Sequence, residues 1–236
     1  MNILAVGAHP DDLEIACYGT LIKYINTGNN VFVCHVSNGN LGHVEIMPDE
    51  LGVIRTKEAE KAAGLIGAKH YSLDVDDQYV DSSNDEQVLK LSRVIREVQP
   101  DLIITHYFQD YHRDHMETYR LVFRATCCAS LAHYDSDYGQ KIAPICPLYL
   151  MDTLANAGFE PTEYVDISDT IDLKLKALAA HESQVVWMKE HDKIDFIEFV
   201  KNCSAVRGYQ CGASFAEGFR ADMNYGRMTT KRVLPE

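Results

Sequence analysis

Two short stretches of this chain concentrate the residue types that bind metal ions or move protons. The first runs from His9 to Glu14 (His-Pro-Asp-Asp-Leu-Glu) and holds one imidazole and three carboxylates. The second runs from Asp110 to His115 (Asp-Tyr-His-Arg-Asp-His) and holds two histidines and two aspartates. Imidazole and carboxylate ligands without thiolate suit Zn²⁺, and Fe²⁺ takes the same set. Metal-assisted chemistry is therefore the first hypothesis.

Each stretch also has a purely structural interpretation. Proline at the first helical position and acids in the first turn are ordinary helix-start signals, which would account for Pro10 and some of the acids. They do not account for His9, because histidine is a poor N-cap. The second stretch could be a polar loop in which Asp114 caps the next helix. The structural interpretation is weaker for both stretches together than for either alone.

The two stretches follow apolar runs that favour buried strands, at residues 3–6 and 101–107. In a doubly wound sheet the first and fourth strands are neighbours, and ligands bind where their carboxyl ends flank the switch point. We therefore expect the two clusters to converge. An aspartate beside a bound metal can take a proton from the metal-bound water. One of Asp11 and Asp12 could therefore be a metal ligand and the other the base, and the spacing alone does not say which is which.

Alternating apolar and helical segments predict an α/β fold, a Rossmann-like three-layer sandwich with a mainly parallel sheet and the metal site at the switch point between strands one and four. We expect a single domain over residues 1–236 with a less regular tail. Further strands are predicted at residues 31–36, 71–75, 148–152 and 163–167. Helices are predicted at residues 13–28, 53–66, 85–98, about 116–133, 168–182 and 191–206.

Composition narrows the class of protein. The formal charge of −13 argues against nucleic acid and anionic membrane partners, which need a basic surface. We expect no membrane span and no secretory signal, because the N-terminal apolar run is short and belongs to the first strand. The seven cysteines include no Cys-x-x-Cys pair, as in proteins of a reducing compartment, and we expect a cytoplasmic protein.

Residues 8–14 together with Asp110-x-His-x-Asp-His115 resemble the PIG-L/LmbE family of zinc-dependent N-deacetylases. The pattern is most similar to the bacillithiol-biosynthesis subgroup, the N-acetylglucosaminyl-malate deacetylases. Weaker markers extend the resemblance over nearly the whole chain: Gly19-Thr20, Arg55-x-x-Glu58, Ile167-Ser-Asp, Ser183-Gln184 and Ala216-Glu-Gly-Phe219. One departure is Arg113, which stands where family members often have proline.

The resemblance implies a role for each motif residue. His9, Asp12 and His115 would bind zinc. Asp11 would be the general base, and His112 would stabilise the oxyanion and protonate the leaving amine. Asp114 would orient His112. Arg55 would face the substrate and grip a hydroxyl or carboxylate, with a solvated helix charge as the alternative. His106 and Cys17 match no family role and are expected to be buried packing residues. Trp187, Tyr209 and Arg220 could border a sugar pocket.

The implied activity is hydrolysis of an N-acetyl group on an N-acetylglucosamine-type small molecule, with Zn²⁺ (or Fe²⁺) supplying hydroxide to the amide. The resemblance also implies a homo-oligomer, a trimer or hexamer. The alternatives are another amide as substrate, or a hydratase acting on a small acid. A nucleotide-binding module would need Gly-x-Gly-x-x-Gly after the first strand, where this chain has Gly7-Ala-His-Pro-Asp-Asp. A non-catalytic zinc scaffold is a further alternative, which is less favoured because a structural zinc site would normally have four protein ligands.

Overall fold

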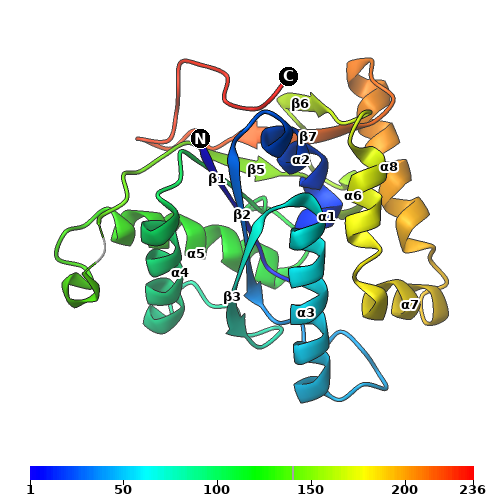
Figure 1. Cartoon of the computed structure of the whole chain (residues 1–236), viewed down its shortest axis with the longest axis horizontal. Coiled ribbons are helices and arrows are strands. Elements are labelled where there is room, and N and C mark those ends of the chain that lie inside the picture. Colours follow the sequence, from blue (N-terminus) through cyan, green and yellow to red (C-terminus); the bar gives the residue numbers. More distant parts are fainter. Residues whose placement is uncertain (140) are drawn as a thin grey trace.

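A seven-stranded sheet in the order β3-β2-β1-β4-β5-β7-β6 forms the centre of the molecule (Figure 1). The computed structural model describes residues 1–139 and 141–236. The strands are β1 (Asn2–Gly7), β2 (Asn30–Ser37), β3 (Lys69–Val75), β4 (Leu102–Thr105), β5 (Leu148–Met151), β6 (Glu163–Asp166) and β7 (Ala216–Ala221). Pairing is parallel from β3 to β5, and β7 is antiparallel to both of its neighbours. The predicted mainly parallel sheet is confirmed.

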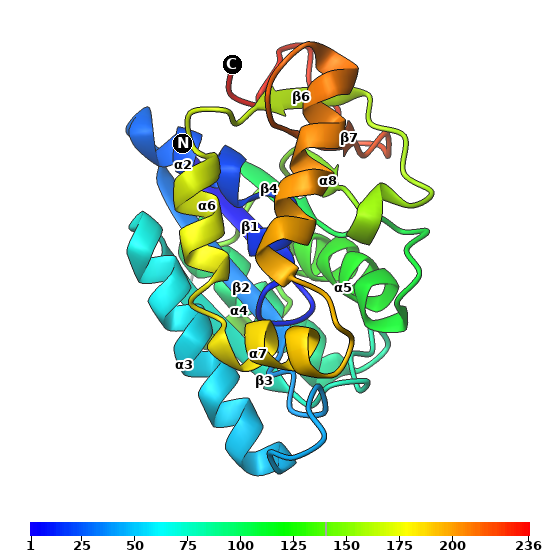
Figure 2. The ribbon, with the colours of Figure 1, turned by 90° about the vertical axis from the view of Figure 1, so that its right-hand side faces the viewer.

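Helices cover both faces of the sheet. They are α1 (Asp12–Ala16), α2 (Tyr18–Asn26), α3 (Pro48–Ile66), α4 (Asp85–Val98), α5 (Arg113–Ala129), α6 (Ile171–Leu178), α7 (Glu182–Glu190) and α8 (Phe196–Cys211). In Figure 1, α4 and α5 lie to one side of the central strands and α3 and α6 to the other. Figure 2 shows α6, α7 and α8 in front of the sheet. Over residues 1–139 and 141–236, none of the helices combines the length and the apolar character that crossing a bilayer requires.

The central strand β1 places the first motif. Its residues 3–6 are fully buried, because a parallel strand covered on both faces is apolar throughout. It pairs with β2 on one side and β4 on the other, with Val6 opposite both Cys34 and Thr105. The predicted adjacency of strands one and four is confirmed, and both motifs emerge from the same edge of the sheet.

The helix predicted at residues 13–28 is wrong as a single element, because the chain leaves helical geometry at Cys17 and starts α2 anew. The new helix start has a carboxylate partner from β7. Glu217 accepts hydrogen bonds from the backbone N–H groups of Gly19 and Thr20 and from the Thr20 hydroxyl. A carboxylate at a helix N-terminus is stabilised by the exposed N–H groups and the helix dipole. Lys174 Nζ lies 2.7 Å from Glu217 Oε1 and balances its charge.

The strand β7 was not predicted, since residues after 206 were expected to be irregular. Glu217 and Gly218 interrupt the apolar pattern that marks a strand, and glycine weakens a strand interior. Both have tertiary reasons: Glu217 is the buried partner of α2, and a Cβ on Gly218 would lie 2.6 Å from Pro161 Cγ. Both contacts join residues far apart in the sequence, so the local pattern does not indicate a strand here.

The C-terminal helices also differ in their bounds from the prediction. A separate helix, α7, lies across the boundary predicted between residues 182 and 191. Its first turn is tied to α3, because the Glu58 carboxylate accepts hydrogen bonds from Ser183 N and Oγ. The family markers Glu58 and Ser183 therefore join two helices far apart in sequence.

We expect Gly19→Ala to lower the free energy of unfolding by about 1–3 kcal/mol, because the added Cβ overpacks the core. That Cβ would lie within 2.7–2.9 Å of three Ile167 side-chain carbons. Gly64→Ala in α3 is the matched control, since its Cβ meets nothing within 4 Å and alanine stabilises a helix interior by about 0.5–1 kcal/mol. Urea unfolding measures both, and equal stability of Gly19→Ala and the unmodified chain would contradict the packing argument.

Candidate active site

The loop after β1 holds a strained aspartate. Asp11 has φ 110° and ψ −25°, in the left-handed region that few non-glycine residues adopt. Such a conformation persists only where its surroundings hold it, and it is enriched at functional sites. The next residue fixes one side of the loop, because Asp12 Oδ2 accepts a 2.7 Å hydrogen bond from His9 N.

Arg55 of α3 fixes the other side of the loop. Its guanidinium is buried and donates to the carbonyl oxygens of Pro10 and Gly39 and to Asp11 Oδ2 at 3.2 Å. Gly39, at φ 66°, permits this approach, since a Cβ there would lie 2.3 Å from Arg55 Nη1. The predicted contact of Arg55 with substrate stays a prediction, and the alternative of a solvated helix charge is wrong.

The adjacent acids Asp11 and Asp12 are both buried, but the pKa of Asp11 is raised and the pKa of Asp12 is lowered. Burial raises the pKa of Asp11 to about 6, and Asp12 adds to this while Arg55 opposes it. Burial also penalises ionised Asp12, but His115 and His106 outweigh it and hold the pKa of Asp12 well below its usual range. Asp11 is therefore the stronger base of the two at neutral pH, and Asp12 remains ionised.

His9 and His115 stand on either side of the Asp12 carboxylate. His9 Nδ1 lies 3.4 Å from Asp12 Oδ2, and His115 Nε2 lies 3.3 Å from Asp12 Oδ1. The remote nitrogen of each ring faces another carboxylate: His115 Nδ1 lies 3.1 Å from Asp110 Oδ1, and His9 Nε2 lies 3.2 Å from Asp77 Oδ1. A carboxylate on the remote nitrogen is the usual arrangement for metal-binding histidines, because it fixes the ring and its tautomer.

His112 caps α5 and faces the cleft. Its Nδ1 accepts a hydrogen bond from the backbone N–H of Asp114, which leaves the proton of the neutral ring on Nε2. Burial lowers the pKa of His112, so the ring is neutral at pH 7. Its Nε2 lies 3.3 Å from Gln78 Nε2, so an Nε2–H requires the Gln78 amide to turn its oxygen toward the ring.

The contact between Asp114 and His112 runs through the Asp114 backbone. The Asp114 carboxylate accepts from Gln78 N at 2.7 Å and lies 3.4 Å from His9 Nε2. Its predicted role in orienting the His112 ring stays a prediction. Arg113 turns toward the Gln78 carbonyl and is not among the residues that line the cleft.

His106 is buried, as expected, but it is part of the site rather than a packing residue. Its Nε2 accepts a hydrogen bond from Ala8 N at 2.9 Å, lies 3.2 Å from Asp12 Oδ2, and its ring stacks on His115 at 4.0 Å. Burial lowers the pKa of His106 to about 4, so the ring is neutral. Cys17 is fully buried in the apolar core, as expected.

A cleft of about 200 Å³ is lined by Asp11, Asp12, Arg55, Asp110 and the four histidines His9, His106, His112 and His115. Sequence reasoning missed much of its lining: Ile15, Ala16, Asp77, His106, Met151, Asp152, Leu154, Gln184, Met188 and Phe196. A positional signal existed for Asp77, which follows β3 at its carboxyl end. No local signal marked the apolar members. Trp187, Tyr209 and Arg220 are not among the lining residues.

The donor set fits a zinc or iron ion. Three groups of ligand atoms lie within 4.8 Å of one another: His9, His112 and His115; Asp12, His106 and His115; and His9, Asp77 and Asp114. All are imidazole or carboxylate donors, which suit Zn²⁺ and Fe²⁺. The predicted trio of His9, Asp12 and His115 is in mutual contact but draws on two of these groups.

Fold and site together define an α/β protein with a candidate metal-binding cleft at the switch point of its sheet. The sequence pattern of the family described as "PIG-L: GlcNAc-PI de-N-acetylase" matches residues 4–126, slightly more than half of the chain. The chain belongs to this family, as the motifs predicted.

Two named relatives are deacetylases, and a third has a different named activity. The chain is 26% identical over 226 residues to diacetylchitobiose deacetylase of Thermococcus kodakarensis, covering 93% of this chain and 82% of the relative. The solved structure of N,N'-diacetylchitobiose deacetylase from Pyrococcus horikoshii matches with a TM-score of 0.81 and 28% identity, over 93% of this chain and 83% of that one. A 4-oxalmesaconate hydratase of Pseudomonas putida is 26% identical over 193 residues, covering 78% of this chain and 74% of the relative.

We expect zinc binding to the metal-free chain to release about one to two protons at pH 7. Burial lowers the pKa of His115, but Asp12 and Asp110 outweigh it and raise the pKa to about 9. For His9, bonds to Asp114, Asp12 and Asp77 likewise overcome burial and raise its pKa. Protonated imidazoles must lose their protons to bind metal, so zinc affinity falls as pH falls. Calorimetry in two buffers of different ionisation enthalpy counts the protons, and a count of zero would contradict these shifts.

Proposed function

We propose that this protein hydrolyses the N-acetyl group of an N-acetylglucosamine-type small molecule in a metal-dependent reaction. The observation that carries the proposal is the difference between the two adjacent acids. Asp12 is ionised and lies between the imidazoles of His9 and His115. Asp11 contacts Arg55 instead, and burial raises its pKa. A zinc ion bound in this cleft would polarise the amide carbonyl and lower the pKa of a water molecule. Membership of a de-N-acetylase family and the named deacetylase relatives support the same activity.

We assign His9, Asp12 and His115 as the metal ligands, for reasons of hydrogen bonding. His106 Nε2 already accepts from Ala8 N, so it has no free lone pair toward the cleft. The Asp114 carboxylate is fully buried, accepts from Gln78 N and is absent from the cleft lining. Asp77 and His112 are the remaining competitors. Asp77 lines the cleft beside His9. His112 would bind through Nε2 only after losing the proton that the helix cap leaves there.

The chain's other groups then divide the proton transfers. Asp11 takes the proton from the attacking water, since its raised pKa makes it a better base than an ordinary aspartate. The Nε2–H of His112 donates to the carbonyl oxygen as negative charge develops there. The C–N bond breaks, and the proton held by Asp11 moves to the departing nitrogen, in place of the His112 proton that the resemblance implied.

A hydratase acting on a small acid is the second candidate, favoured by the relative from Pseudomonas putida. The two reactions leave different products. A deacetylase releases acetate and a free amine, whereas a hydratase consumes a carbon–carbon double bond. Acetate release from N-acetylglucosamine conjugates by the zinc-loaded protein decides between them.

We expect Asp11→Asn to lower kcat by about 10²–10⁴-fold while zinc stays bound, because the amide cannot accept the proton. Asp49→Asn, at an exposed acid of α3, is the control and is expected to leave kcat unchanged. Acetate release and metal content by atomic absorption are the measurements. Loss of zinc in Asp11→Asn would show that Asp11 is a ligand.

A second series tests the ligand assignment through zinc affinity. Asp110→Asn is expected to weaken zinc about 10–100-fold, as changes to a carboxylate behind a histidine ligand do, and His115→Ala is expected to weaken it further. His112→Ala is expected to keep zinc and lose about 10²–10³ in kcat. Competition with a chromophoric chelator measures affinity, and zinc loss in His112→Ala would place His112 among the ligands.

We also propose that the protein acts in the cytoplasm and as a homo-oligomer, on the grounds of its cysteine pattern and its family resemblance. Sedimentation of the purified protein tests the second point.

A further inference from the structure

One side of the cleft is an apolar wall, formed by Ile15, Met151, Leu154, Met188 and Phe196. The wall is assembled from several elements: α1, β5, the short 3₁₀ helix Leu154–Asn156, α7 and α8. Ile15, Met188 and Phe196 belong to one packed apolar cluster, so the wall is continuous with the protein interior. The metal chemistry and proton transfers proposed above use none of these side chains.

The charged lining residues are almost all acids. Within the part of the chain that the structure describes, the cleft is lined by five aspartates, one arginine and no lysine. The aspartates are Asp11, Asp12, Asp77, Asp110 and Asp152. The arginine is Arg55, and its donated hydrogen bonds already go to Pro10, Gly39 and Asp11. Its Nε has no partner but is buried, and the residue as a whole is 4% exposed, so the guanidinium offers little accessible surface to a second anion.

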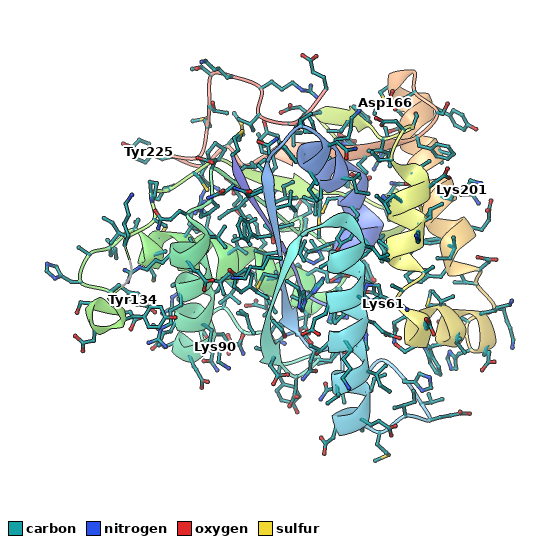
Figure 3. The ribbon with its side chains drawn as sticks, viewed as in Figure 1. Lys61, Lys90, Tyr134, Asp166, Lys201 and Tyr225 are labelled. Atoms are coloured by element: carbon teal, nitrogen blue, oxygen red, sulfur yellow. The ribbon has the colours of Figure 1, made fainter. Side chains whose placement is uncertain are left out.

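Neighbouring cations are also committed elsewhere. Arg207 makes a two-point contact with Asp152, at 2.5 Å and 3.0 Å, and Lys174 pairs with Glu217. Arg113 donates to the Gln78 carbonyl. Figure 3 shows Lys61 and Lys201 on the outer surfaces of α3 and α8, and Lys61 pairs there with Glu182.

We propose that the substrate is an uncharged N-acylated amino-sugar conjugate whose aglycone has an apolar face and packs on this wall. The inference rests on the proposed deacetylase function and adds the chemical class of the group beyond the sugar. Even with the two charges of a bound zinc ion and the one charge of Arg55, the five aspartates leave the lining net acidic. A carboxylate or phosphate on the aglycone would meet this acidic lining, and an unpaired desolvated charge is strongly disfavoured. The malate conjugate suggested by the subgroup resemblance is such an anion.

Three conjugates of N-acetylglucosamine test the proposal with the zinc-loaded protein: the phenyl glycoside, the malate glycoside and the 1-phosphate. We expect kcat/KM for acetate release to be at least about tenfold higher for the phenyl glycoside than for either anion. Equal or higher values for the anions would overturn the inference and leave the deacetylase function standing. Absence of acetate from all three would instead overturn the proposed function on which it rests.

A pair of variants on α7 tests whether the wall sets this preference. Met188→Lys places a cation on the wall and is expected to narrow the phenyl-to-malate ratio, by lowering KM for malate and raising KM for phenyl. Val186→Lys adds the same charge two residues away, at a half-exposed position outside the cleft lining, and is expected to leave the ratio unchanged. An unchanged ratio in Met188→Lys, or an equal change in both variants, would show that the wall does not contact the aglycone.

Discussion

Two buried carboxylates on consecutive residues are the constraint on which the rest of the site depends. Asp11 and Asp12 repel each other, and burial penalises each ionised form. The fold resolves this by giving them different partners: Arg55 from α3 for Asp11, and His115 from α5 with His106 for Asp12. The left-handed backbone at Asp11 is part of the same arrangement, held by the bond from Arg55 to the Pro10 carbonyl. One pair of neighbours thereby acquires two distinct chemical characters.

The remaining acids of the cleft follow the topology of the sheet. Asp77, Asp110 and Asp152 come after the carboxyl ends of β3, β4 and β5, as Asp11 and Asp12 come after β1. Parallel strands bring all these ends to one edge, so acids separated by many residues line one cleft. Asp77 and Asp110 face the remote ring nitrogens of His9 and His115. The acidic edge therefore supports the imidazoles that a metal ion would require.

The C-terminal third closes the cleft through buried polar contacts. Glu217 of β7 receives hydrogen bonds from the start of α2 and pairs with Lys174 of α6, and Glu58 of α3 holds the first turn of α7. These contacts fix α6, α7 and β7 against the N-terminal half. They give structural roles to Gly19-Thr20, Glu58, Ser183 and Glu217, none of which is a catalytic candidate. Their effect is to present Met188, and with it the apolar wall, to the metal-binding edge.

Local pattern was enough to predict the central strands, the adjacency of β1 and β4, and the convergence of the two motifs that contain His9 and His115. The sequence by itself determined these because each depends on short apolar runs and on a strand order that chain topology restricts. Only the tertiary structure decided the break at Cys17, the strand β7, the partners of each ring nitrogen, the entry of His106 into the site, and the apolar wall. Those features depend on contacts such as Ile15 with the cluster around Phe196, between residues whose separation in sequence leaves no periodic signal.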